Sequence, residues 1–151
     1  MKSRLLQDHE GLRTFALVLS TGDEVMTSLN AFAAEQQLLA TQLTAIGALS
    51  RVVVAFFDWA PREYRHIRID EQVEVLSLLG DVTLDDGAPK VHTHIVVGKA
   101  DGSAHGGHLI EGIVRPTLEI ILVELPAHLR RRFDPDSGLP LIDPGDVGQR
   151  T

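Results

Sequence analysis

The chain has 151 residues, which suits one domain, and 44% of them are hydrophobic, so it can bury a substantial core. Its formal net charge of −7 is opposite to the basic balance with which a nucleic-acid binder neutralises phosphates. It contains no cysteine, so disulfides and thiolate metal sites are excluded, and a metal site would have to use His, Asp or Glu.

Residues 1–12 are predicted to be an N-terminal extension outside the domain. They contain no long apolar run of the kind found in signal peptides. No stretch of the chain approaches the roughly 18 apolar residues of a membrane span. We therefore expect a cytoplasmic protein with no membrane partner.

The next segments predict one strand followed by one long helix. Residues 13–20 form a short apolar run that ends at Thr21-Gly22, which is typical of a buried strand and a turn. Asp23 occupies the position of a helix N-cap. Apolar residues then follow at helical spacing: Val25, Leu29, Phe32, Ala33, Leu39 and Leu43. This stripe predicts an amphipathic helix of about five turns.

Beyond Gly47 the pattern predicts short strands joined by turns. The strands are expected at residues 48–57, 64–69, 71–84, 91–98, 104–109 and 117–125. A break at Gly80-Asp81 remains open. Asp-Gly turns between short strands indicate a mainly antiparallel sheet, one face of which the long helix would cover. The predicted class is therefore α+β, with a compact domain over residues 13–125 and an irregular Pro/Gly-rich tail over 126–151.

Three histidines form the strongest functional signal. His92 and His94 lie two apart in a predicted strand, so their side chains share one face. If the next turn is the three residues 100–102 with Gly102 in the left-handed conformation, Lys99 faces Ser103 and His94 faces His108. By the same parity, His105 points to the other face.

This constellation predicts a metal site formed by His92, His94 and His108. Three imidazoles without a thiolate are typical of open sites, in which a further position is left for a ligand. Zinc is favoured, although imidazole also suits nickel, copper and iron. The alternative is a row of ordinary strand histidines. Gly106-Gly107 before His108 indicates either the close approach of a ligand or backbone, or a bulge at a sheet edge.

The same residues resemble a known family. His92-Thr93-His94, Asp101-Gly102 and Gly106-Gly107-His108-Leu109, together with Ile46–Leu49 and Val73–Gly80, are similar to the motifs of the PPC (plants and prokaryotes conserved) domain. The resemblance covers residues 13–125. It implies a compact α/β domain around an antiparallel sheet, a homotrimer, and metal ligation by the residues at 92, 94 and 108.

The resemblance further implies that in plant relatives the domain follows a DNA-binding AT-hook and mediates assembly. This chain has no Arg-Gly-Arg-Pro hook, so direct DNA binding is not expected. His105 departs from the family pattern and is not counted as a ligand.

Other polar residues leave alternatives open. Glu111 could be a fourth ligand or a general base, or simply a hydrogen-bonded residue. Asp58 and Asp81 are interpreted as turn-forming. The basic cluster at Arg130–Arg132, with His128, could contact a phosphate or an acidic partner, but a solvated face or an intersubunit ion pair is favoured. Trp59 and Tyr64 could line a pocket or pack in a turn.

Three classes of function follow. The favoured one is a metal-binding module whose open position captures a small molecule or anion. The others are a metal-dependent hydrolase and a DNA-associated assembly protein. The acidic charge disfavours the third class, and Glu111 is the only candidate acid–base group for the second. Whether the protein is an enzyme stays open at this point.

Overall fold

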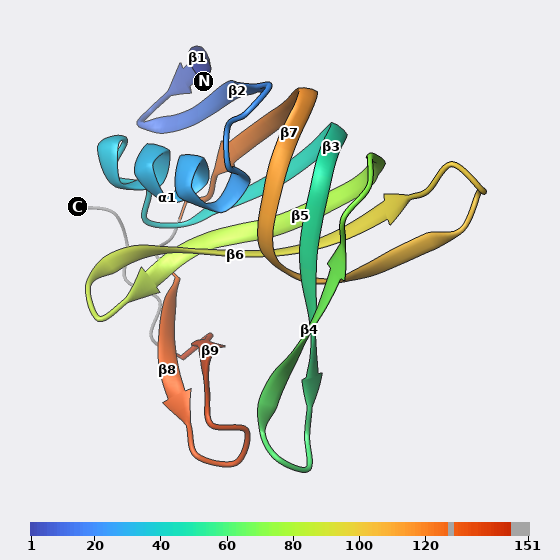
Figure 1. Ribbon diagram of the computed structural model, residues 1–151. Coiled ribbons are helices and arrows are strands. Elements are labelled where there is room, and N and C mark those ends of the chain that lie inside the picture. Colours follow the sequence, from blue (N-terminus) through green and yellow to red (C-terminus); the bar gives the residue numbers. More distant parts are fainter. Residues whose placement is uncertain (127–128, 146–151) are drawn as a thin grey trace.

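The structure is a computed structural model that describes residues 1–126 and 129–145 (Figure 1). Its elements are β1 (Lys2–His9), β2 (Leu12–Ser20), α1 (Val25–Glu35), β3 (Thr41–Asp58), β4 (Glu63–Ile69), β5 (Val73–Asp85), β6 (Ala88–Gly98), β7 (Ala104–Glu124), β8 (Arg130–Asp134) and β9 (Leu139–Asp143). The strands form one sheet, and within the described residues only the pairing of β5 with β8 is parallel. The predicted, mainly antiparallel sheet is confirmed.

Four strands pair in a closed circuit. β3 pairs with β5 and β7, and β6 pairs with the same two strands. β2 and then β1 extend the sheet beyond β7, while β4 continues from the far end of β3. The circuit brings the ends of β6 and β7 that carry the histidines next to the β3–β4 hairpin.

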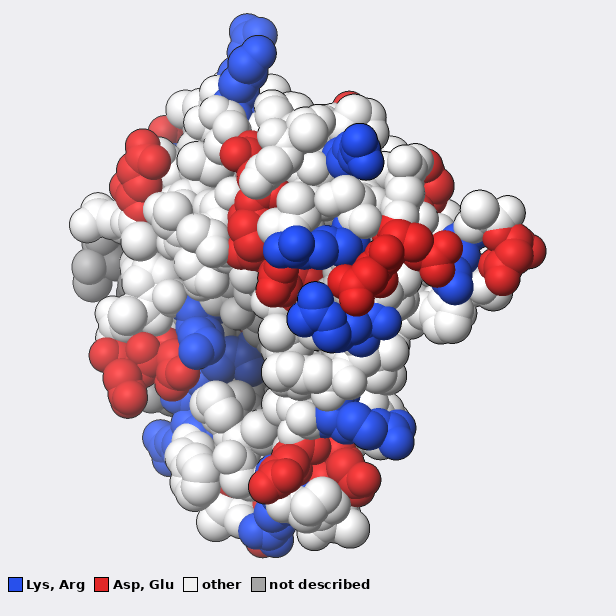
Figure 2. Space-filling model, viewed as in Figure 1, with Lys and Arg blue, Asp and Glu red and all other residues white. Residues whose placement is uncertain are grey.

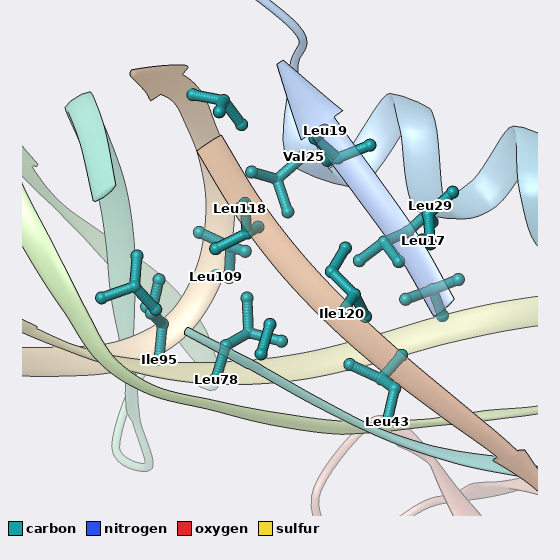
Figure 3. Close-up of a cluster of buried hydrophobic side chains, with 14 of the residues drawn as sticks. Leu17, Leu19, Val25, Leu29, Leu43, Leu78, Ile95, Leu109, Leu118 and Ile120 are labelled. Atoms are coloured by element: carbon teal, nitrogen blue, oxygen red, sulfur yellow. The ribbon is translucent and has the colours of Figure 1, made fainter. Parts of the chain in front are cut away.

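The core lies between the sheet and α1, which packs against β6 and β7. Figure 3 shows aliphatic side chains of α1, β2, β3, β5, β6 and β7 in this core: Leu17, Leu19, Val25, Leu29, Leu43, Leu78, Ile95, Leu109, Leu118 and Ile120. All ten are 2% exposed or less, so each contributes hydrophobic stabilisation to the fold. The result is a compact single domain of mostly β-sheet with one helix.

The prediction of a long helix is wrong, because α1 has 11 residues, or about three turns. It begins after Glu24, whose carboxylate accepts hydrogen bonds from the Met26 and Thr27 amides, and not after Asp23. It ends at Glu35 with Gln36 as its C-cap, and Gln37 takes a left-handed φ of 51°. Leu43 lies on β3, where alternate residues from Thr41 are buried. A spacing of four residues between Leu39 and Leu43 fits both the helical period of 3.6 and the strand period of 2. The pairing of this segment with neighbouring strands makes it a strand.

Several segments are more ordered than the sequence indicated. Residues 2–9, expected to be an extension, pair with β2 as strand β1. The strands predicted at 104–109 and 117–125 belong to one continuous strand, β7. β5 is not broken at Gly80 but continues to Asp85. Residues 130–143, expected to be irregular, form the β8–β9 hairpin, which packs against the rest of the domain through β5.

The described part of the chain contains no helix with the length and apolar character needed to cross a membrane.

Candidate metal centre

The hairpin between β6 and β7 has the predicted register. The Gly102 amide donates to the Lys99 carbonyl at 2.9 Å, and the Lys99 amide donates to the Ser103 carbonyl at 2.9 Å. Gly102 has a φ of +82°, the left-handed conformation that this turn requires. His94 therefore lies directly opposite His108.

His92, His94 and His108 form a triangle on one face of the sheet. The centroids of the His92 and His94 rings and of the His92 and His108 rings are 5.1 Å apart, and those of His94 and His108 are 5.4 Å apart. Each ring offers one nitrogen, and these three atoms lie within 4.8 Å of one another. His105 stands outside this group, beside Ser103 on the other face of the hairpin.

The histidines fit a metal ion because one of them has an unmet bonding requirement. Nδ1 of His108 is buried and has no hydrogen-bond partner in the part of the chain that the structure describes. Buried polar atoms are rarely left in this state, since desolvation without a partner costs about 1–3 kcal/mol. A metal cation bound by the three histidines could accept the lone pair of an unprotonated imidazole nitrogen and so provide a bonding partner.

The environment also keeps His94 and His108 unprotonated. Burial, followed by the nearby His92, His94 and Arg131 charges, lowers the pKa of His108 to about 4. Burial and the neighbouring His92 lower the pKa of His94 as well. At neutral pH these two imidazoles therefore carry lone pairs, which is the form that binds transition metals.

Two glycines bring His108 into position. A Cβ on Gly107 would lie 2.6 Å from the Ala55 carbonyl oxygen of β3, and a Cβ on Gly106 would lie 2.7 Å from the Ile95 carbonyl oxygen of β6. His108 pairs with both neighbouring strands, opposite His94 and Ala55. Of the alternatives left open for Gly106-Gly107, the close approach of neighbouring backbone is the one that the structure shows.

Asp81 stands behind His92, so its interpretation as a turn residue is wrong. It lies within β5, opposite His92, with its Oδ2 atom 3.6 Å from His92 Nδ1. Its Oδ1 atom accepts a hydrogen bond from Arg131 Nη2 at 2.7 Å. Burial would raise the pKa of Asp81, but hydrogen bonds and charges from His92 and Arg131 outweigh burial and lower it. Asp81 therefore stays ionised beside His92.

The sequence held a signal for Asp81. Asp86-Gly87 is a two-residue turn in which both residues have positive φ, typical of a type I′ hairpin. Counting outward from Asp85 and Ala88 places Asp81 opposite His92. Arg131 had no such signal, because β8 pairs with β5 at a single register position, Leu84 opposite Arg130, and no short turn connects the two strands.

A pocket of about 400 Å³ opens above the histidines. Its lining consists of Tyr64, Lys90, Val91, His92, His94, His108, Arg131, Leu139, Pro140 and Leu141. The β3–β4 and β8–β9 hairpins project side by side from the sheet, and Arg62 Nη1 donates to the Pro135 carbonyl at 3.3 Å between their tips (Figure 1). In the same view, Figure 2 shows a hollow between them with basic side chains at its wall.

Aromatic residues contribute to the site and to the turn beside it. The Tyr64 ring stacks on His108 at a centroid distance of 5.0 Å, so Tyr64 lines the pocket. Trp59 packs edge-on against Phe57 at 6.2 Å, as expected for turn packing. Asp58 accepts from the Ala60 amide at 3.2 Å, which confirms its turn-forming role.

The remaining candidates lie outside the histidine group. Glu111 forms an ion pair with Arg51 at 2.8 Å, which agrees with the interpretation of a hydrogen-bonded residue. In the basic cluster, Arg131 pairs with Asp81 and Arg132 pairs with Asp143 at 3.1 Å, both within the chain. His128 lies outside the described residues.

Comparison with known proteins supports the resemblance. Residues 6–126 match the sequence profile of the Plants and Prokaryotes Conserved (PCC) domain. The PPC protein of Pyrococcus horikoshii has 32% identity and a TM-score of 0.82, over 87% of this chain and 92% of that one. A metal-containing protein from Archaeoglobus fulgidus has 30% identity and a TM-score of 0.81, over 94% and 96%. A candidate DNA-binding protein from Bacteroides thetaiotaomicron has 28% identity and a TM-score of 0.83, over 86% and 91%.

Among curated proteins, the chain is similar to the bifunctional protein GlmU of Synechococcus. The identity is 33% over 130 residues, which is 84% of this chain. The chain spans about a fifth of the length of these relatives.

Proposed function

The chain belongs to the Plants and Prokaryotes Conserved domain family, and from this premise we propose that it is a metal-binding domain. His92, His94 and His108 would hold one divalent transition metal ion. Zinc is favoured because three histidines with one open position form a common ligand set of this ion. Coordination by three protein ligands leaves a further position for a small molecule or anion. Once bound, the ion supplies Lewis acidity at the floor of the pocket.

One observation carries this proposal: three ring nitrogens lie within 4.8 Å of one another, and a buried His108 nitrogen has no other partner among the described residues. Two further features support it. Asp81 beside His92 Nδ1 matches the common arrangement in which a carboxylate orients a metal-ligating histidine. One structurally similar protein, from Archaeoglobus fulgidus, is metal-containing.

Metal analysis of the purified protein tests the proposal. We expect about one equivalent of metal per chain after zinc is supplied, and loss of this metal in the His94→Ala variant. His105→Ala is the matched control, because His105 lies on the same hairpin but outside the group, and it should keep its metal. Wild-type protein that stays metal-free in the presence of zinc would refute the site.

We further propose that the protein assembles as a homotrimer. Five large apolar residues line a shallow depression on the sheet and are exposed in the single chain: Val18, Ile46, Leu76, Leu79 and Ile121. Apolar patches of this kind on a soluble domain are typical of protein interfaces. The family resemblance supplies the number of subunits.

Sedimentation velocity tests the assembly. We expect the wild-type protein to sediment at three times the mass of one chain, and the Ile46→Asp variant to shift toward monomer, since the charge would be buried without a partner. Phe133→Asp is the control, because Phe133 is 66% exposed but lies away from this depression. A stable wild-type monomer at micromolar concentration contradicts the trimer.

Association with DNA is a second candidate, favoured by the similar structure of the candidate DNA-binding protein. Acidic and basic side chains alternate on the face shown in Figure 2, and the net charge is −7. A duplex-binding assay at physiological salt should therefore show only weak binding that falls steeply as salt rises. Tight binding that persists at high salt would favour this second function.

A further inference from the structure

The β8–β9 hairpin forms one wall of the histidine pocket. Leu139, Pro140 and Leu141 of β9 line it together with Arg131 of β8. The hairpin lies beyond residue 126, where the match to the family profile ends. The histidines therefore lie within residues 6–126, which match the family profile, whereas the β8–β9 hairpin that lines their pocket lies outside this match.

Arg131 fixes this wall relative to the histidines. Its guanidinium donates from Nε to Thr83 Oγ1 at 2.8 Å, from Nη2 to Asp81 Oδ1 at 2.7 Å, and from Nη1 to the Pro140 carbonyl at 3.1 Å. The side chain is only 8% exposed. A planar guanidinium held at three points ties β9 to β5, so the wall is a fixed part of the site.

The two ends of the pocket differ in chemistry. At one end are the three imidazoles and the Lys90 ammonium, and the described lining contains no Asp or Glu. With a divalent ion on the histidines this end is positively charged, because the carboxylate of Asp81 is already paired with Arg131. The wall formed by β9 is apolar: Leu139, Pro140 and Leu141.

We propose that this pocket binds a small monocarboxylate with a short aliphatic chain, and that Leu139 and Leu141 select the chain. The carboxylate would lie toward the metal and Lys90, and the chain would lie against β9. A single ammonium beside the ion favours a singly charged head group. The volume of about 400 Å³ fits a small ligand. This inference rests on the proposed metal site.

The test uses the full chain loaded with Co²⁺, whose visible absorption reports ligands that bind at or beside the metal. Metal content is measured first, and the protein is then titrated with acetate, butyrate and hexanoate. We expect affinity to rise by about threefold to fourfold for each methylene that is buried. In the Leu139→Ser/Leu141→Ser variant this dependence on chain length should disappear, while acetate affinity and metal content stay as in the wild type.

Two other variants complete the design. Phe133→Ser changes an exposed residue on the same hairpin that does not line the pocket, so it should keep the wild-type dependence on chain length. Lys90→Gln should weaken all three carboxylates by a similar factor of about twofold to fivefold, and it tests the orientation without touching the hairpin.

The outcomes separate this inference from the proposal on which it rests. A protein that takes up no metal overturns both. A metal-loaded protein that binds the three carboxylates equally, or whose preference survives the double substitution in β9, overturns only the inference and leaves the metal site intact.

Discussion

At the scale of single residues, the candidate site includes two charged residues beside the histidines, Asp81 and Arg131. Asp81 lies 3.6 Å from His92 Nδ1 and is held ionised by Arg131. A carboxylate in this position orients the imidazole and makes it a better donor to a metal. Asp81 and Arg131 are therefore positioning residues for His92.

The Asp81→Asn substitution should weaken metal binding by about 10- to 100-fold, because the amide keeps the shape of the side chain but loses the charge. Competition with a chromogenic zinc chelator measures the affinity. Asp70→Asn is the matched control, since Asp70 is 62% exposed and forms an ion pair with Arg68. Equal affinities in the Asp81 and Asp70 variants would rule out the positioning role.

A second ion pair, between Arg13 and Glu124, has one buried partner and is expected to contribute to stability. Glu124 is fully buried, and Arg13 donates to it through its backbone amide at 3.0 Å, its Nε at 2.7 Å and its Nη2 at 3.0 Å. Arg13→Ala should lower the free energy of unfolding by about 3–5 kcal/mol, since the carboxylate stays buried without its guanidinium. Urea denaturation measures this change.

The exposed pair between Arg68 and Asp70 provides the comparison. Both side chains are 62% exposed, so Arg68→Ala should cost less than about 1 kcal/mol. If the two substitutions cost the same, burial does not govern the strength of these pairs.

At the scale of elements, Glu24 joins α1 to β7. Its carboxylate accepts from the amides of Met26 at 3.1 Å and Thr27 at 2.6 Å, and also from the Gly112 amide of β7 at 3.1 Å. One side chain thus caps the helix and fixes it to the sheet. This explains why the helix begins one residue later than the sequence predicted.

These hydrogen bonds make the stability depend on pH. Burial would raise the pKa of Glu24, but its hydrogen bonds, chiefly from Thr27 and then Gly112 and Met26, outweigh burial and lower the pKa below its ordinary value of 4.5. The folded state therefore holds the proton less tightly than the unfolded chain. The contribution of Glu24 is present above pH 4.5 and is lost as pH falls through the lowered pKa.

Glu24→Gln should flatten this part of the stability profile and cost about 1 kcal/mol at pH 7. Thermal denaturation at a series of pH values measures both effects. Glu35→Gln, at the exposed end of the same helix, is the control for removing one carboxylate from the helix. A Glu24→Gln profile parallel to that of the wild type contradicts the assignment.

The packing of β7 against β3 and β6 is the second element-scale feature. A Cβ at Gly107 would meet the Ala55 carbonyl oxygen at 2.6 Å, so Gly107→Ala should push the strands apart and displace His108. We expect lower stability together with weaker zinc binding, read from denaturation and chelator competition. Gly87→Ala is the control, because a Cβ there meets no atom within 4 Å and its cost should come from its positive φ alone. Wild-type zinc affinity in the Gly107 variant would show that the close approach is unimportant for the site.

At the scale of the whole molecule, the histidine pocket brings together strands that are far apart in the sequence. The pocket is built from β4, β6, β7, β8 and β9, which span residues 63–143. An ion held there would bind only the folded chain, and so would stabilise it by mass action.

Metal removal should therefore lower the midpoint of thermal unfolding. At free zinc 100 times above the dissociation constant, the stabilisation is about 2.7 kcal/mol, which a chelator should abolish. The His94→Ala variant should unfold at the same temperature with and without chelator. A chelator effect of equal size in that variant would place the stabilising ion elsewhere.

Much of the site could be predicted from the sequence because its geometry is local. Residues two apart on a strand share a face, and the Asp101-Gly102 turn sets the register that places His94 opposite His108. The strand segments and the antiparallel sheet follow from the same short-range alternation. Asp81 was within reach of the same counting across Asp86-Gly87.

The rest depended on contacts between distant segments. The apolar stripe from Leu39 to Leu43 fits a helix as well as a strand, and only pairing with β5 and β7 made it β3. The Pro/Gly-rich C-terminal segment shows no strand pattern of its own. It forms the β8–β9 hairpin, which Arg131 links to β5 by reaching Asp81, 50 residues earlier in the chain. The sequence by itself thus determined the three histidines and their common face, since strand parity and turn type act over a few residues. Only the tertiary structure decided how the helix ends, what lies behind His92 and what walls the pocket, because those features depend on side chains that meet only when the chain has folded.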